Sequence, residues 1–287
     1  MKNKSGLFGL SSPMSSFTRA CAPAKLAGLA LIASAALGTQ AHAAVTFTGT
    51  DGGTRSASAE FSVSGDTLSI RLTNTSTFDV TAPDQLLSSV YFSFLSGSTP
   101  ALTKTGGGVA LDGSQIYYNG VNVTAGPYGG GGNVSGEYAF KSGLTGGVLG
   151  SDTFFGVSSN GMGAFDFGTG DRFSNVNLHD PDAPNGMNYG ISSFGDIVST
   201  YNGGIGDEPI INYSVLITLK GASGLDLSKL DGVRFQYGTD HSNPNFAGTP
   251  TDPNNPINVI PEPGSTAALM GLLSCGLFLR SRRTRTA

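Results

Sequence analysis

The sequence contains no tryptophan, two cysteines and three histidines among 287 residues. Without tryptophan, the chain lacks the side chain that stacks most strongly on flat ligands. Cys21 and Cys275 lie near the two ends, inside segments that carry the features of removable signals. The body between them therefore has neither a disulfide nor a thiol nucleophile, and its stability must come from its core.

Basic residues are also scarce in the body. Residues 44–258 hold eight Lys and Arg against nineteen Asp and Glu, a formal charge of about −11. An acidic surface repels phosphate and anionic lipid headgroups, so nucleic acid is excluded as a partner drawn in by charge. Solubility alone is a sufficient reason for this charge.

No sustained apolar period of 3.6 residues runs through the body, and no internal repeat of 20 to 50 residues is visible. Short alternating segments appear instead, separated by Gly, Asn, Asp and Ser. We predict strands over residues 45–48, 59–63, 68–72, 90–94, 115–118, 137–140, 153–157, 210–219 and 233–237. The one short helical candidate covers residues 226–230.

The clearest local prediction is a hairpin. Phe61 and Val63 face the same way, Leu68, Ile70 and Leu72 can meet them, and Gly65 between the runs can take the positive φ of a tight turn. A sheet without helices must bury its apolar face on a second sheet. We therefore predict an all-β domain, an antiparallel two-sheet sandwich of the jelly-roll-like kind.

Glycine is concentrated between residues 126 and 207, and the sequence leaves two interpretations open. Glycine loses much backbone entropy on folding, so the segment either stays a flexible loop or makes tight turns where side chains cannot fit. Ordered loops at one end of a sandwich commonly carry ligand sites. Residues 240–255, rich in Asp, Asn and Pro, suit a surface linker.

The N-terminus has the three parts of a secretory signal peptide. Lys2, Lys4, Arg19 and Lys25 form a basic region, residues 26–37 are apolar, and Ala41 and Ala43 form an Ala-x-Ala cleavage site. A permanent transmembrane helix is the alternative, but about twelve apolar or small residues are too few to span a bilayer. Signal peptidase cleavage would make Ala44 the first residue of the mature protein.

The C-terminus carries a second ordered set of features. Pro261, Glu262 and Pro263 precede an apolar run over residues 267–279, and a basic cluster follows that consists of Arg280, Arg282, Arg283 and Arg285. At about 1.5 Å per residue the run spans roughly 20 Å, against about 30 Å of hydrocarbon, so it suits a transient membrane anchor. The arginines would act as the membrane stop on the cytoplasmic side. The two prolines keep the adjacent chain extended and accessible to a protease.

This order resembles the PEP-CTERM sorting signal of exosortase-processed surface proteins of Gram-negative bacteria. The resemblance implies export through the inner membrane, transient anchoring there, exosortase cleavage, and a place at the cell surface or outside the cell. Short body segments at residues 72–76, 82–87, 189–191, 195–196 and 235–239 also resemble some of these proteins, without adding a catalytic residue. Three parts follow: a signal peptide (1–43), a surface domain (44–258) and a sorting tail (259–287). An ordinary C-terminal anchor remains the alternative.

Candidate chemistry in the body is sparse. Asp180, Asp182 and Gly186 resemble part of a calcium loop, but the spacing of an EF-hand is not kept, so an Asx-Pro turn explains them and Ca²⁺ is only a weak cofactor hypothesis. His179 and His241 lack the surroundings of a nucleophile elbow or a zinc motif and are explained as loop residues. We assign no catalytic and no metal-binding residue.

Three functional hypotheses remain. The first is a structural or adhesive component of an exopolysaccharide or biofilm matrix, with signal peptidase, exosortase and exopolysaccharide as partners. The second is a carbohydrate-binding module in which exposed tyrosines stack on sugar rings, the candidates being Tyr117, Tyr118, Tyr128, Tyr189 and Tyr201. The third is a secreted hydrolase of the glycoside hydrolase type, in which any two of the nineteen acidic residues of the body could form the carboxylate pair; only Glu60, Glu137 and Glu208 among them are glutamates.

Overall fold

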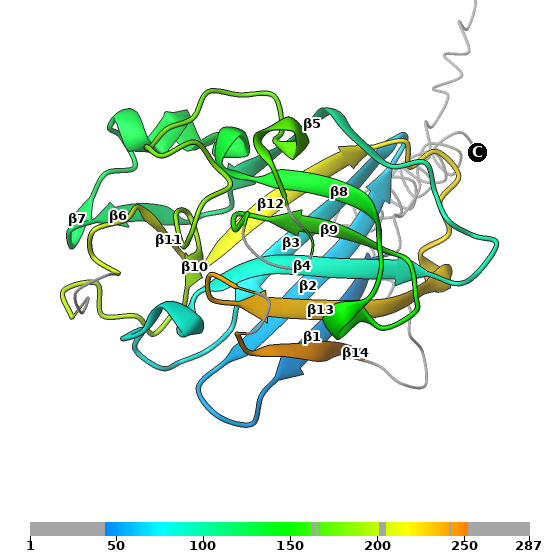
Figure 1. Cartoon of the computed structure of the whole chain (residues 1–287), viewed down its shortest axis with the longest axis horizontal. Helices are drawn as coiled ribbons and strands as arrows, with labels where there is room; N and C mark the ends of the chain where they lie inside the picture. Colours follow the sequence, from blue (N-terminus) through cyan, green and yellow to red (C-terminus); the bar gives the residue numbers. More distant parts are fainter. Residues whose placement is uncertain (1–43, 162–164, 166, 201–204, 241–242, 252–287) are drawn as a thin grey trace, which may run out of the picture. The chain divides into compact units, whose positions relative to one another are not determined.

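A computed structural model describes residues 44–161, 165, 167–200, 205–240 and 243–251 (Figure 1). Within these ranges the chain forms fourteen strands and six short 3-10 helices. The strands are β1 (Ala44–Thr50), β2 (Ser56–Ser64), β3 (Thr67–Asn74), β4 (Leu87–Phe94), β5 (Thr103–Leu111), β6 (Gln115–Tyr118), β7 (Val121–Asn122), β8 (Ala139–Leu144), β9 (Phe154–Ser158), β10 (Ile191–Ser192), β11 (Ile210–Asn212), β12 (Ser214–Lys220), β13 (Leu230–Tyr237) and β14 (Asn245–Pro250). The 3-10 helices are η1 (Pro83–Gln85), η2 (Pro127–Gly132), η3 (Ser135–Glu137), η4 (Gly147–Leu149), η5 (Thr169–Asp171) and η6 (Leu227–Lys229). The all-β prediction is confirmed.

The predicted hairpin is β2 and β3. Its register pairs Phe61 with Ile70 and Val63 with Leu68, and Gly65 in the turn has φ +58°. Phe61, Leu68 and Ile70 are fully buried, as the alternation requires. The helical candidate at 226–230 is η6, whose first turn is capped by the Asp226 carboxylate accepting from the Ser228 N–H.

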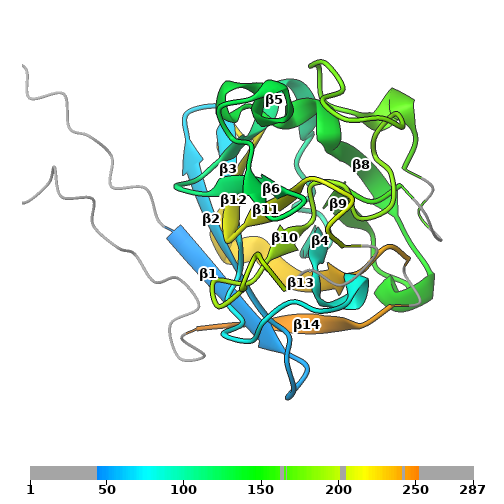
Figure 2. The same cartoon turned by 90° about the vertical axis from the view of Figure 1, so that its left-hand side faces the viewer.

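The strands do not form two separate antiparallel sheets, as the sequence had led us to predict. They belong to one sheet in the order β5-β12-β3-β2-β1-β14-β13-β4-β10-β11-β6-β7, with β9 and β8 branching from β4, and the β10–β11 pair is parallel. The sheet curls, so that a first arm (β5, β12, β3, β2 and β1) faces a second arm (β13, β4 and the strands beyond it), as Figures 1 and 2 show. β14 joins the arms by pairing with β1 on one side and β13 on the other.

The core fills the space between the two arms. The Phe61 ring of the first arm meets Phe92 of the second with centroids 5.4 Å apart, and Phe92 stacks on Phe155 of β9 at 5.4 Å. All three side chains belong to the same buried cluster. Aromatic contacts between the two arms therefore hold this core together, as packing between the two sheets does in a sandwich.

β4 is buried along its whole length because both of its faces are covered. On the face away from the main core, Tyr91 packs against Phe165 with ring centroids 5.1 Å apart, within a second cluster that includes Phe154 and Phe167. This covering explains why the β4 sequence is almost continuously apolar or small.

Four strands were missed by the sequence analysis: the two-residue strands β7 and β10, and the longer strands β5 and β14. β14 lies where we predicted a surface linker over residues 240–255, and its Phe246 packs on Phe235 and Tyr237 at 5.9 and 5.5 Å. β5 contains three successive glycines, of which Gly107 lies so close to β12 that an added Cβ would be 2.2 Å from the Thr218 carbonyl oxygen. In both strands backbone pairing outweighs poor strand propensity.

The predicted strand over residues 210–219 is divided at Tyr213, which has φ +95°. β11 pairs with β6 and β10 in the second arm, whereas β12 pairs with β3 and β5 in the first. Tyr213 is thus the corner where the chain passes between the arms. Its N–H donates to Ser192 and its carbonyl accepts from Asn74, and these bonds stabilise the strained corner.

The glycine-rich segment is ordered over residues 126–137. An added Cβ on Gly129 would lie 1.7 Å from the Thr124 carbonyl oxygen, and one on Gly136 would lie 1.8 Å from that of Val176. These glycines are therefore sites of close backbone approach, which was the second of the two interpretations. Among the residues that the structure describes, no helix is long and apolar enough to cross a membrane. The predicted signal peptide and the predicted short C-terminal membrane helix lie outside those residues.

Candidate functional site

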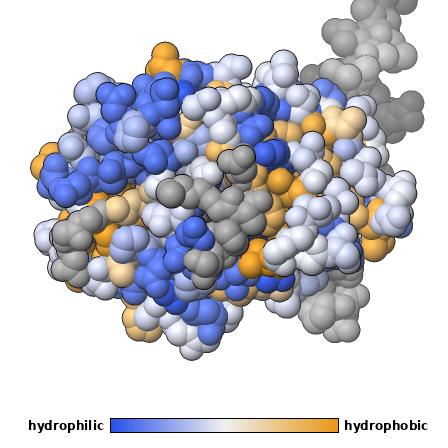
Figure 3. Space-filling view, in the orientation of Figure 1, coloured by the Kyte–Doolittle hydropathy of each residue, from blue (hydrophilic) through white to orange (hydrophobic). Residues whose placement is uncertain are grey.

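Two of the tyrosines predicted as ligand contacts meet His179. Tyr118 ends β6, Tyr128 lies in η2, and His179 follows a loop after η5. Their ring centroids are 5.1 Å (Tyr118–Tyr128), 5.4 Å (Tyr118–His179) and 5.3 Å (Tyr128–His179) apart. We call these three residues the Tyr–His cluster. All three are partly exposed, and Figure 3 shows hydrophilic residues gathered over the end of the protein that carries β6 and β7.

Two buried tyrosines fix the position of the cluster from beneath. The Tyr138 hydroxyl donates to the Tyr189 carbonyl at 2.7 Å, and the Tyr189 hydroxyl donates to the Tyr128 carbonyl at 2.9 Å. Burial raises the pKa of both phenols, which keeps them protonated as donors. Tyr189 has φ +55°, a conformation that an interior tyrosine adopts only when its surroundings hold it there.

His179 is held by a carboxylate and an amide. Its Nδ1 lies 3.3 Å from Glu208 Oε2 and 3.4 Å from Asn188 Nδ2. Burial raises the pKa of Glu208, and the neighbouring His179 acts in the opposite direction. The sequence analysis treated His179 as a loop residue, but its side chain is only 16% exposed. The contact with Glu208 was not predicted because 29 residues separate them in the sequence.

Glu137 anchors the backbone that carries His179. One carboxylate oxygen of Glu137 accepts the Leu178 N–H, while the other has no hydrogen-bond partner among the described residues although Glu137 is fully buried. Burial raises the pKa of Glu137 to about 7, partly offset by that backbone bond and by Arg172. Near neutral pH both the protonated and the ionised form of the Glu137 carboxyl group are therefore populated.

The remaining predicted residues have other positions. The Tyr117 hydroxyl donates to Gln115 at 2.6 Å and makes no ring contact with the Tyr–His cluster, and Tyr189 is buried beneath it. In the calcium-loop candidate, the Asp182 carboxylate lies 3.6 Å from the Arg172 guanidinium. No group of three or more metal-ligating side chains occurs in the described ranges. The predicted processing and membrane-stop residues, together with Tyr201 and His241, lie outside the described ranges.

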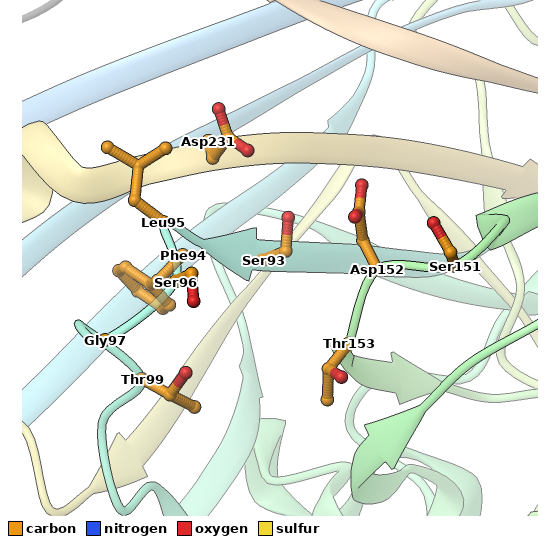
Figure 4. Close-up of a pocket in the computed structure, with 10 residues that line it drawn as sticks. All are labelled: Ser93, Phe94, Leu95, Ser96, Gly97, Thr99, Ser151, Asp152, Thr153 and Asp231. Carbon is orange, nitrogen blue, oxygen red and sulfur yellow. The ribbon is translucent and has the colours of Figure 1, made fainter.

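A separate polar pocket of about 460 Å³ lies at the end of β4 (Figure 4). Its wall combines the β4 residue Ser93, the turn over residues 95–98, the segment before β9 with Asp152, and Asp231 of β13. In Figure 4 the side chains of Ser93 and Asp152 point the same way, toward the side on which Asp231 lies. No sequence pattern predicted this pocket, because its parts come from three segments that are distant in the chain.

The Tyr–His cluster presents aromatic ring faces and polar ring edges, which suit a ligand that has both apolar and hydroxyl-bearing surfaces. His179 makes no hydrogen bond to a serine or threonine hydroxyl within the described part of the chain, so no nucleophile–base pair is formed there. Comparisons of the chain with protein families, with characterised proteins and with solved structures found no match.

Proposed function

We propose that this protein is exported, processed by an exosortase-like protease, and retained at the cell surface or in an exopolysaccharide matrix, where its role is structural or adhesive. The observation that carries the proposal is the order of features in the C-terminal sequence: Pro261, Glu262 and Pro263, then the apolar run, then the terminal arginines, all of which follow the β-strands of the body. We infer a role without catalysis, for which the single curled sheet with its two facing arms would be the scaffold.

The position of the strands relative to the two signals supports the proposal. β1 begins at Ala44, the first residue after the Ala41–Ala43 cleavage motif, and β14 ends at Pro250, before the tail begins. All described strands therefore lie between the two processing sites, so neither cleavage would remove a part of the sheet.

The segments that carry the two predicted processing sites join the sheet at neighbouring points, one before the start of β1 and the other after the end of β14. β1 and β14 are antiparallel partners, and the Thr251 N–H donates to the Thr46 carbonyl at 3.0 Å. Eleven residues lead from Pro250 to Pro261, which limits their separation to about 40 Å even when fully extended. A body held through its C-terminus would thus stay close to the surface that holds it.

Intact-mass measurement on protein from its native host tests the processing. We expect the mature chain to begin at Ala44 and to lack Leu279 and Arg285. A variant with Pro261, Glu262 and Pro263 all replaced by Ala should keep the tail and stay in the membrane fraction. A triple Ala variant at Ser142, Thr145 and Ser151, which are exposed in the body, is the matched control. A wild-type mature chain that still carries Arg285 would contradict the proposal.

A second candidate function is carbohydrate binding, favoured by the Tyr–His cluster. Co-sedimentation of the exported protein with the host exopolysaccharide would measure it, and Tyr118→Ala with Tyr128→Ala should weaken the binding. Tyr117→Ala is the control, because Tyr117 lies outside the cluster. Equal binding by all three proteins would assign the matrix contact to another surface. A hydrolase remains the third hypothesis; the His179–Glu208 contact is one feature of the described residues that it could use.

A further inference from the structure

We propose that the polar pocket at the end of β4 binds a saccharide unit that carries no negative charge. The inference rests on the proposed function only in taking its ligand from the surrounding polysaccharide. It concerns a site distinct from the Tyr–His cluster, built from residues that the sequence analysis did not single out.

A β-bulge places one of the two acidic groups. β13 pairs Leu230 with Phe94 and Gly232 with Ser93, so Asp231 is an extra residue with no partner on β4. Such a bulge turns a side chain out of the regular ladder, and bulges are frequent beside binding sites. Asp231 is exposed at this bulge and lines the pocket.

Ser93 provides the second independent feature. Its side chain is 3% exposed and lines the pocket, yet its hydroxyl forms no hydrogen bond with any described residue. The residue is buried, but its hydroxyl oxygen is not one of the fully enclosed side-chain atoms that lack a partner, so this oxygen is accessible from the pocket. Gly232 leaves the space that this hydroxyl occupies, since an added Cβ there would lie 2.7 Å from Ser93 Oγ. The Ser93 hydroxyl is therefore available to a ligand.

The opposite wall adds the second carboxylate. Asp152 is exposed, and neither Asp152 nor Asp231 forms an ion pair or hydrogen bond with a described residue. The loop that leads to Asp152 is closed by the Gly146 N–H donating to the Gly150 carbonyl at 2.7 Å. Two unpaired carboxylates therefore face one cavity from separate, well-supported segments.

The lining selects the chemical class of the ligand. Ser93, Ser96, Thr99, Ser151 and Thr153 supply hydroxyls that can both donate and accept, and the two aspartates supply strong acceptors for ligand O–H groups. Leu95, which is 44% exposed, adds an apolar side chain for the C–H face of a sugar ring. No lysine or arginine lines the pocket, so an anionic uronate would meet uncompensated like charge.

The volume of the pocket favours a saccharide over a bare cation as its ligand. A volume of about 460 Å³ lies within the range of small-molecule sites. Ca²⁺ needs six to eight oxygens at about 2.3–2.6 Å, and a cavity of this size with two carboxylates does not provide so close a shell. A polyol ligand uses the hydroxyls, the carboxylates and the apolar rim together.

Isothermal titration of the exported protein with maltotriose, cellotriose, mannotriose and chitotriose, with trigalacturonate as the anionic probe, tests the proposal. We expect saturable binding of at least one uncharged trisaccharide and at least about tenfold weaker binding of trigalacturonate. Asp152→Asn with Asp231→Asn should weaken binding about tenfold, the loss expected for a charge-assisted hydrogen bond. Gly232→Ala should also weaken it by displacing the Ser93 hydroxyl.

The matched control is Asp66→Asn with Asp226→Asn, which removes the same charge from two exposed sites outside the pocket and keeps the oxygen that caps η6. The proposal fails if no uncharged trisaccharide binds at about 10 mM, or if the pocket and control variants bind equally. It also fails if calcium binding, read from a melting shift, is lost in the pocket variant while saccharides do not bind. Because these titrations do not depend on the tail, a negative result would leave the mass test of processing unaffected.

Discussion

The first arm of the sheet and the loop-rich region, which we define as residues 119–137 and 173–190, are held together in different ways. In the first arm, alternating side chains such as Phe61 and Ile70 point into one core, and three of its strands, β1, β2 and β3, are consecutive in sequence. In the loop-rich region, single hydrogen bonds such as that from Tyr189 to Tyr128 span 61 residues, and glycines let backbones touch. The first arm depends on apolar area, whereas the loop-rich region depends on a few specific contacts. We therefore expect changes of side-chain volume to act most strongly in the first arm, and changes of backbone or protonation in the loops.

The largest expected effect is that of Phe61→Ala. Phe61 is fully buried and its ring contacts both Phe47 and Phe92. Its removal leaves a cavity between the arms and should lower the free energy of unfolding by about 3–5 kcal/mol. Urea denaturation followed by circular dichroism measures this, with Phe61→Leu as a milder control. A loss below about 1 kcal/mol would mean that the core is not shared between the arms.

Gly136→Ala should have the next largest effect, because the new Cβ would overlap the Val176 carbonyl oxygen at 1.8 Å. We expect a loss of about 3 kcal/mol, near the upper end for overpacking. Gly65→Ala is the matched control, since Gly65 has φ +58° but no atom within 4 Å of an added Cβ. Its cost should be only the roughly 1 kcal/mol of left-handed backbone strain. If the two variants are equally stable, the loops do not depend on close backbone contact.

A third expected effect, seen only when the pH is varied, is a pH dependence of stability assigned to Glu137. Burial raises its pKa in the folded protein to about 7, whereas the unfolded chain loses that proton near the ordinary glutamate pKa. Between these values the folded state binds more protons, so the free energy of unfolding should fall as pH rises toward 7. Glu137→Gln should flatten this part of the stability curve. Parallel curves for the two proteins would show that Glu137 does not contribute.

These contrasts explain what the sequence could predict. The β2–β3 hairpin and η6 depend on neighbours within a few residues, and both were predicted correctly. β14 was missed because its residues show no alternation, and only its pairing with β1 and β13 makes it a strand. Because β14 is the strand that joins the two arms, missing it led us to predict two sheets instead of one curled sheet.

The same limit applies to the candidate sites. Tyr118 and Tyr128 were proposed from residue type alone, but their meeting with His179 requires three segments to converge. Tyr117 looked equivalent in sequence and faces elsewhere, because adjacent residues of a strand point to opposite faces. Asp231 could not be predicted as a pocket residue without knowledge of the β-bulge, which depends on the register of β13 against β4.

β14 also determines how the body would respond to mechanical force. In an anchored protein, a pull on the tail acts along β14, and inter-strand hydrogen bonds run perpendicular to that direction. Because β14 is bonded to β1 on one side and to β13 on the other, both ladders are loaded in shear and share the tension. Because pulling β14 out of the sheet would also break the link between the two arms, detachment of β14 and opening of the core would occur together.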